Sequence, residues 1–319
     1  MTAQEIFNLA IKVGMENDLR GKDHVQKHLD RIKEKYDKMS DREKEFFDTE
    51  RLTNPYSDTR IHNLADSKKE IKKVLVGIDI GGAELLLAKQ LGDIDLVIEH
   101  HPNGKSLVDL SDVMSMQAEI LAQYGVPINI AESLLKPRIS EVSRSTSPSN
   151  HSRSADMAKI LGVNYMNIHT PCDNLVAKFL YDLVEKNKNK LEFVGDVMDL
   201  IETVPEYREA KKTGAGPTLF SGGKENYCGK IAITEITGGT EGTHDIYQYL
   251  SQAGIGTVIG MHQSEKHIKE AKKAHINALI AGHMSSDSIG VNLFLHMLEK
   301  QGIEIVTCSG VIRHSRNQK

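Results

Sequence analysis

The sequence DLVIEHHP at residues 95–102, together with IKKVLVGID at residues 71–79, decides the fold class. Each is a short aliphatic run that ends in acidic or histidine side chains. The intervening segment at 84–91 has helical character, and strands that alternate with helices indicate β-α-β units and a largely parallel sheet. The sequence therefore predicts an α/β fold.

The same alternation continues toward the C-terminus. Further strands are expected at 165–169, 231–236, 256–260, 276–281 and 303–307, and helices at 111–123, 155–161, 174–210, 244–252, 265–273 and 287–300. Two of the expected strands run into a histidine, at His100 and at His283. We therefore expect two similar halves, at about 69–190 and 191–319.

The N-terminal region has a different composition. Of the first 50 residues, 22 are charged, and capping-box spacing occurs at Thr2/Glu5 and Ser40/Glu43. We interpret residues 1–68 as a charged helical extension packed on an α/β body at 69–319. An oligomerisation or lid element is the alternative.

Composition excludes several classes of protein. The net charge is −4, with 40 basic and 44 acidic residues, so we expect no dedicated nucleic-acid surface. No apolar run is long enough for a membrane helix, and the first 20 residues lack a secretory pattern. The three cysteines are too few and too widely spaced for a disulfide framework, which favours a cytoplasmic protein. The 14 histidines justify a search for a metal site.

The candidate metal ligands stand where strands end. In open α/β sheets, side chains just past the carboxyl ends of strands face the crevice that binds ligands. Five such side chains form a donor set that suits Zn, Mn or Fe: His100, His101, Asp173, His283 and Asp287. The side chains of adjacent residues point in different directions from an extended backbone. We therefore expect His100 and His101 either to bind two neighbouring ions or to lie on a loop that turns one of them back. Two divalent ions bridged by a carboxylate or hydroxide are the usual means by which such a set activates water.

The motifs resemble a known family. His100-His101-Pro102 after a strand, His169-Thr170 with Asp173, and Gly282-His283 with an acid four residues on are similar in order and character to the NIF-three-like family. These are the NGG-interacting-factor-three proteins, and bacterial members are often labelled GTP cyclohydrolase type 2 homologues. The resemblance covers roughly residues 71–310.

The resemblance implies two intertwined, similar α/β halves with a dinuclear metal site between them, and a ring-shaped hexamer built from dimers. It implies that the acid at position 287 bridges the two ions. Here Asp287 replaces the family's usual Glu and is one methylene shorter. The stretch between the histidine pair and Asp173 is longer than in typical members, and the N-terminal extension is additional.

Substrate and proton-transfer candidates lie nearby. His169 is the candidate catalytic residue, because it precedes Asp173 by four positions and can orient a ligand or move a proton. In the polar segment 138–154, Arg144, Asn150 and His151 are candidate substrate-binding residues, and arginines suit an anionic substrate. A solvated loop is the plainer interpretation of that segment.

Two classes of function follow. The first is a metal-dependent hydrolase that acts on a nucleotide or another phosphorylated or cyclic-amide compound through metal-activated water. The second is a metal-binding structural or regulatory protein without turnover.

The segment at 76–82 resembles the first phosphate motif of actin-like sugar kinases, but a kinase would leave the histidines unexplained.

Overall fold

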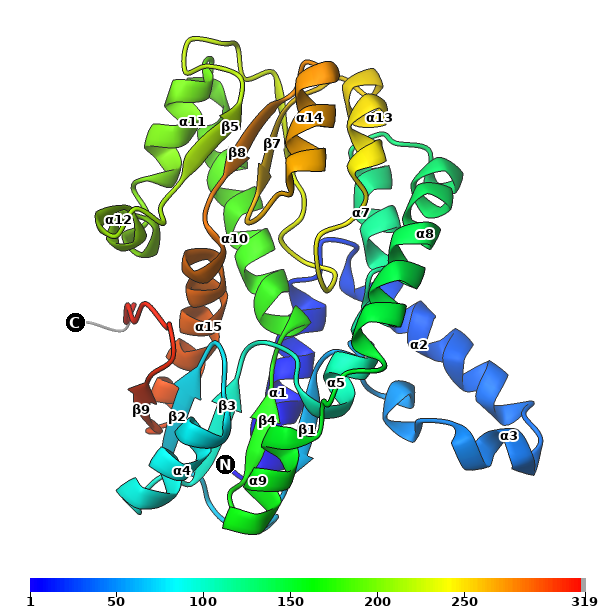
Figure 1. Ribbon diagram of the computed structural model, residues 1–319, viewed down its shortest axis with the longest axis vertical. Coiled ribbons are helices and arrows are strands. Elements are labelled where there is room, and N and C mark those ends of the chain that lie inside the picture. The colour runs from blue at the N-terminus through cyan, green and yellow to red at the C-terminus, as the bar shows by residue number, and fades with distance from the viewer. Residues whose placement is uncertain (317–319) are drawn as a thin grey trace.

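The computed structural model describes residues 1–316 and contains two mainly parallel sheets, which confirms the predicted α/β class (Figure 1). The strands of the first sheet lie in the order β1 (Arg60–Asn63), β4 (Tyr165–Asn167), β3 (Leu96–Glu99), β2 (Lys73–Gly77) and β9 (Glu304–Thr307). Only the edge strand β1 is antiparallel to its neighbour.

The second sheet repeats this topology. Its strands lie in the order β5 (Thr218–Ser221), β8 (Asn277–Ile280), β7 (Ile255–Gly260) and β6 (Lys230–Ile233), and again only the first is antiparallel. The strand β9, from the end of the chain, pairs with β2 of the first sheet, so the two halves are intertwined. In this correspondence β8, which precedes His283, matches β4 and not β3, which precedes His100.

The helices cover both sheets and fill the space between them. Those of the first half are α1 (Ala3–Glu16), α2 (Lys22–Asp37), α3 (Asp41–Phe46), α4 (Gly82–Leu91), α5 (Gly104–Val108), α6 (Leu110–Val113), α7 (Met116–Gln123), α8 (Ile128–Thr146), α9 (Arg153–Leu161) and α10 (Thr170–Asn187). Those that follow are α11 (Val194–Ile201), α12 (Pro205–Lys212), α13 (Tyr247–Gln252), α14 (Glu265–Lys273) and α15 (His283–Lys300). Short 3-10 turns are η1 (Thr49–Leu52), η2 (Lys188–Lys190) and η3 (His244–Ile246). Among the residues described, no helix is long and apolar enough to cross a membrane.

The N-terminal region is only partly an extension. Both predicted capping boxes are present, at the starts of α1 and α3. The helix α1 buries Ile6 and Phe7 in the core of the first half, whereas α2 and α3 project from the body (Figure 1). The strand β1 also lies within residues 1–68 and pairs with β4, so this region completes the first sheet.

Several predictions of local structure were wrong. The segment 174–210, expected as one helix, is divided among α10, α11 and α12. The polar segment 138–154 is helical over residues 138–146, where it forms the end of α8, and not a loop. The helix α15 begins at His283, four residues earlier than predicted, because Ser285 and Ser286 bond back to the carbonyl of Gly282 instead of forming a loop. The edge strands β1 and β5 were missed, because both are short and carry polar side chains.

The helices α10 and α15 pack against each other in the middle of the molecule, between the two sheets (Figure 1). A methyl group added at Gly290 of α15 would overlap the carbonyl oxygen of Cys172 in α10. Glycine is therefore required at position 290, because the two backbones are in contact there.

Replacing Gly290 by Ala is expected to lower the free energy of unfolding by about 3 kcal/mol, since the added methyl group forces two packed helices apart. Urea denaturation would measure the change. Gly223→Ala is the matched control, because its new methyl group would meet no atom nearer than 3.5 Å. Equal stability of the two variants would contradict the backbone contact.

Candidate metal centre

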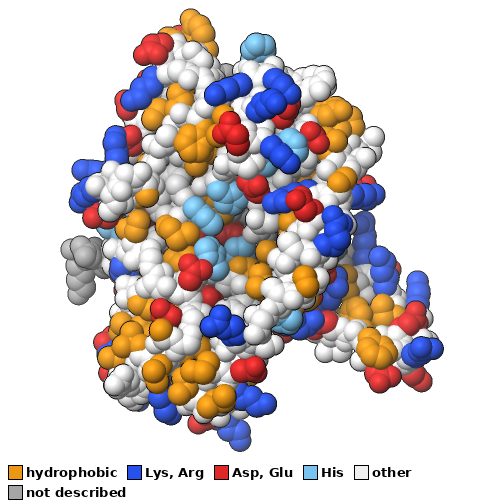
Figure 2. All heavy atoms as spheres, viewed as in Figure 1, with side chains coloured by type: hydrophobic (Ala, Val, Ile, Leu, Met, Phe, Trp, Pro, Cys, Tyr) orange, Lys and Arg blue, Asp and Glu red, His pale blue; other side chains and the backbone are white. Residues whose placement is uncertain are grey.

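The predicted ligands come together where both halves meet. His100 and His101 follow β3, Asp173 lies in the first turn of α10 after β4, and His283 and Asp287 lie on α15 after β8. Asp287 lies in the second turn of α15. The helix predicted at 287–300 would have placed it in the first turn. Figure 2 shows that histidine side chains gather in a hollow between the two halves.

The ring nitrogens and carboxylate oxygens lie at one nearly uniform spacing. The five separations are His100 Nε2 to Asp173 Oδ1, 3.4 Å; His100 Nε2 to Asp287 Oδ1, 3.5 Å; His101 Nε2 to Asp287 Oδ2, 3.3 Å; His283 Nε2 to Asp287 Oδ2, 3.5 Å; and His169 Nε2 to Asp173 Oδ2, 3.6 Å. Two ligand atoms of one tetrahedral ion at about 2.0–2.1 Å are themselves about 3.3 Å apart. The spacing is therefore that of ligands around metal ions.

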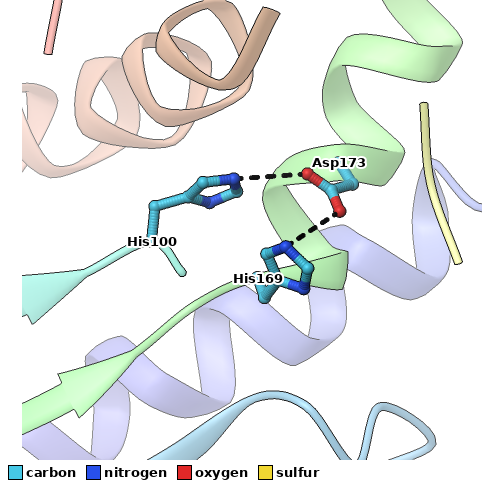
Figure 3. Close-up of side chains that lie close together, drawn as sticks. All are labelled: His100, His169 and Asp173. Atoms are coloured by element: carbon cyan, nitrogen blue, oxygen red, sulfur yellow. Dashed lines mark ion pairs between the residues drawn. The ribbon is translucent and has the colours of Figure 1, made fainter. Parts of the chain in front are cut away.

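The donor atoms form two overlapping groups that could each hold a metal ion. One is His100, His169 and Asp173 (Figure 3), and the other is His100, His101 and Asp287. The two oxygens of Asp287 face different imidazoles, Oδ1 facing His100 and Oδ2 facing His101 and His283. A carboxylate in that orientation can serve two neighbouring ions, even though it is shorter than Glu.

Among residues 1–316, five donor atoms of this centre are buried without a hydrogen-bond partner: Nε2 of His100, both oxygens of Asp173 and both oxygens of Asp287. The three side chains are at most 1% exposed. Buried polar atoms are normally paired, and an unpaired buried charge costs several kcal/mol. The residues present therefore fit divalent cations.

Each of three imidazoles is held through Nδ1, which leaves Nε2 to face the centre. His100 Nδ1 lies 3.0 Å from the carbonyl oxygen of Ile168, His101 Nδ1 lies 2.8 Å from Asp79 Oδ1, and His169 Nδ1 lies 2.7 Å from Asp58 Oδ2. Metal-ligating histidines characteristically donate their other N–H to a carboxylate or carbonyl. Asp58 and Asp79 were not among the predicted site residues.

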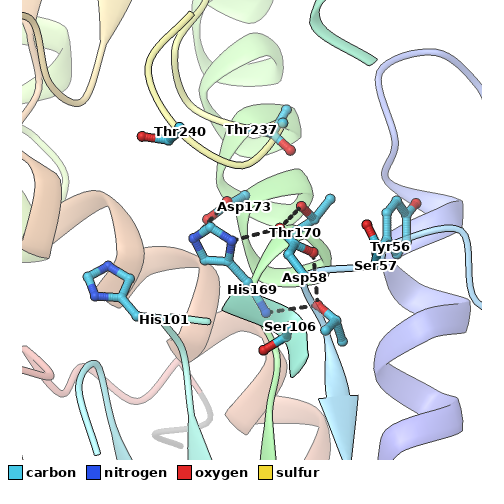
Figure 4. Close-up of polar contacts among 12 residues, drawn as sticks. Tyr56, Ser57, Asp58, His101, Ser106, His169, Thr170, Asp173, Thr237 and Thr240 are labelled. Carbon is cyan, nitrogen blue, oxygen red and sulfur yellow. Dashed lines mark hydrogen bonds and ion pairs between the residues drawn. The ribbon is translucent and has the colours of Figure 1, made fainter. Parts of the chain in front are cut away.

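Asp58 belongs to the N-terminal region and is fully buried. Its Oδ2 accepts hydrogen bonds from His169 and from the hydroxyl of Thr170 at 2.6 Å (Figure 4). The segment 54–58, within the region interpreted as an extension, therefore supplies the carboxylate that orients His169.

Replacing Asp58 by Asn is expected to weaken metal binding about 10- to 100-fold, because His169 loses the carboxylate that fixes its ring. Isothermal titration calorimetry with Zn²⁺ would measure the affinity. Asp66→Asn is the control, since the carboxylate of Asp66 accepts a hydrogen bond from the backbone amide of Lys68 and lies outside the centre. Wild-type affinity in the Asp58 variant would exclude this role for Asp58.

The electrostatics of the centre couple its acids and imidazoles. Burial lowers the pKa of His101, but the nearby carboxylates of Asp287 and Asp79 outweigh it and raise that pKa to about 9. Burial opposes ionisation of Asp287, but the charges of His100 and His283 beside it hold the pKa of Asp287 well below its usual range. Burial lowers the pKa of His283.

The predicted substrate-binding residues are dispersed. Asn150 lines a cavity of about 710 Å³ that reaches His101 and also contains Arg153. Arg144 is exposed on α8 and bonds to Ser140, and His151 bonds to the carbonyl of Ser149; neither lines that cavity. Their roles stay predictions.

No protein-family model and no curated protein matches the sequence. The structure is similar to that of the NIF3 superfamily protein from Sphaerobacter thermophilus, with 28% sequence identity and a TM-score of 0.73 over 80% of this chain and 91% of that chain. The chain is therefore similar to a NIF3 superfamily protein. The suspected resemblance to the NIF-three-like family is confirmed.

Further solved structures resemble this fold at low sequence identity, and two of them are described here. The first is that of reduced HcgD from Methanocaldococcus jannaschii, with 12% identity and a TM-score of 0.49 over 77% of this NIF3-like protein and 87% of HcgD. The second is a Bacillus cereus protein related to NIF3, with 11% identity and a TM-score of 0.38 over 82% and 93% of the two chains.

Proposed function

We propose that this NIF3-like protein is a hydrolase that depends on two divalent metal ions, with Zn, Mn and Fe as candidates. The observation that carries the proposal is the set of five buried donor atoms on His100, Asp173 and Asp287 that have no hydrogen-bond partner among the residues described. In the proposed arrangement, His100, His169 and Asp173 hold one ion, and His101, His283 and Asp287 hold the other.

Bound ions would lower the pKa of a coordinated water and polarise the substrate. The chain's own residues fix the geometry of this chemistry. Asp287 directs its two oxygens to different imidazoles, and Asp79 and Asp58 hold His101 and His169 through Nδ1. As a ligand, His169 would direct Nε2 to the ion; as the catalytic candidate, it would instead use Nε2 to move a proton, so the two roles exclude each other.

The proposed substrate is an anionic small molecule, and a nucleotide or another phosphorylated or cyclic-amide compound fits best. The cavity of about 710 Å³ beside His101 supports this class. Arg153 and Asn150 lie on its polar side, and Met157 and Ile160 supply apolar surface for a ring. GTP cyclohydrolase type 2 activity is one member of this class.

The test is metal analysis followed by an activity screen. The metal-loaded protein is assayed against nucleotides and phosphorylated cyclic amides, with Asp287→Asn as the inactive control. Turnover by the wild type and not by the Asp287→Asn variant supports the proposal. Two bound ions fully saturated by protein ligands, with no turnover, would favour the structural or regulatory alternative. A ring-shaped homo-oligomer and a cytoplasmic location also stay proposals.

A further inference from the structure

The second half presents one more histidine to the metal centre. His262 follows β7, which holds the place in the second sheet that β3 holds in the first. The carbonyls of Glu99 and Gly260, the last residues of β3 and β7, accept hydrogen bonds from corresponding amides at the ends of β4 and β8. His262, two residues beyond Gly260, therefore corresponds to His101, two residues beyond Glu99.

The ends of the two strands contribute differently to the centre. His100 is a candidate ligand, whereas the corresponding position in the second half is Met261, which is buried and offers no nitrogen or oxygen. The ring of His262 lies edge-on against that of His283, with centroids 5.0 Å apart and planes inclined at 75°. His262 therefore adjoins the proposed ligands, but it belongs to neither of the two donor groups.

The ring of His262 is not held by a hydrogen bond to another of the residues described. The carboxylate beside it is that of Glu241, whose Oε2 lies 3.9 Å from Nδ1, beyond hydrogen-bond distance. By contrast, Nδ1 of each of three candidate ligands lies 2.7–3.0 Å from an oxygen: His100, His101 and His169. His262 is therefore not oriented as those ligands are, and its ring nitrogens stay available to a bound molecule.

Three imidazoles form the open face of the centre. The side chains of His101, His262 and His283 are 21%, 25% and 39% exposed, whereas Asp173 and Asp287 are at most 1% exposed. Figure 2 shows histidine side chains in the hollow between the two halves. A molecule that approaches the buried acids from solvent therefore meets these rings first.

The position of His262 complements that of the cavity beside His101. All the residues that line this cavity lie between positions 79 and 160, in the first half. His262 approaches the centre from the second half. A substrate that lies in the cavity and reaches the ions therefore has His262 on its other side.

The chemistry of this ring suits an anionic oxygen. A neutral imidazole carries one N–H donor and one lone pair, and divalent ions nearby would keep the ring neutral, because they disfavour a further positive charge. An N–H donor binds most strongly to an oxygen that carries negative charge. A phosphoryl group has enough such oxygens to contact metal ions and the ring at the same time.

We propose that His262 is a substrate-binding residue that donates a hydrogen bond from its ring to a phosphoryl oxygen of the substrate at the metal centre. The substrate then contacts both halves, and His262 transfers no proton in this role. Among the substrates considered above, the inference selects the phosphorylated ones. It rests on the proposed function, because it requires that the centre hold metal.

The test is the binding of inorganic phosphate to the full-length protein loaded with Co²⁺, measured by isothermal titration calorimetry. His262→Ala is expected to raise Kd about tenfold, which corresponds to the loss of one hydrogen bond to an anion. His262→Gln, whose amide also donates, should stay within about threefold of the wild type. Both variants should keep the wild-type metal content. His244→Gln is the matched control, because its imidazole belongs to the same half and contacts His267 instead of the centre.

The outcomes separate this inference from the proposed function. Wild-type phosphate affinity in His262→Ala would overturn the inference, and so would loss of metal from either variant, because His262 would then be a ligand. A metal-loaded wild type that binds no phosphate would also overturn it. His262→Phe, which keeps a ring but no donor, replaces His262→Ala if that variant fails to fold. Failure of the wild type to bind Co²⁺ would instead refute the proposed function.

Discussion

Replacing Asp287 by Asn is expected to reduce the metal content from about two ions per chain to one or fewer. Asp287 is fully buried, and its oxygens lie 3.3–3.5 Å from Nε2 of His100, His101 and His283. The amide removes the negative charge and turns N–H donors toward imidazoles that must present lone pairs. We expect affinity to fall by at least about 100-fold.

Elemental analysis of the purified variant would measure this change. Asp199→Asn, on the exposed face of α11, is the matched control and should keep the wild-type content. Asp287→Glu restores the acid of the family pattern and is expected to retain metal. Two ions per chain in Asp287→Asn would remove Asp287 from the ligand set.

Loading the stripped protein with metal is expected to raise its melting temperature strongly. An ion that binds only the folded chain stabilises it by about 4 kcal/mol when its concentration is roughly 1,000 times its dissociation constant. For a chain of 319 residues, that corresponds to roughly 6 °C per ion. The physical cause is that the ions neutralise Asp173 and Asp287, which are buried without hydrogen-bond partners.

Differential scanning calorimetry with and without Zn²⁺ would measure this shift, and excess chelator should reverse it. The Asp287→Asn variant should shift much less, which separates binding at the centre from binding at surface histidines. An unchanged melting temperature in the wild type would mean that the buried acids are stabilised in another way.

Aliphatic strands and their last residues were the predictable part of this protein. The runs before His100 and His283 and the segment before Asp173 identified the parallel strands and the crevice to which they lead. The strand-end rule places ligands at an edge because parallel strands end together. It could not show that both halves share one crevice, because that depends on α10 packing against α15.

Other parts of the site left no local signal. Asp58 lies in a loop 111 residues from His169, and only the folded chain brings them together. Asp79 does follow a predicted strand directly, so the strand-end rule could have included it. The antiparallel edge strands β1 and β5 are four residues long and mix polar with apolar side chains, so neither forms an aliphatic run that the sequence pattern could reveal.

The central claim is that two metal ions bind between the halves. Anomalous diffraction at the zinc edge, from crystals of the Zn²⁺-loaded protein, tests it most directly. We predict two peaks per chain about 3.5–4 Å apart, one bounded by His100, His169 and Asp173 and the other by His101, His283 and Asp287. Absence of both peaks from this crevice would contradict the account.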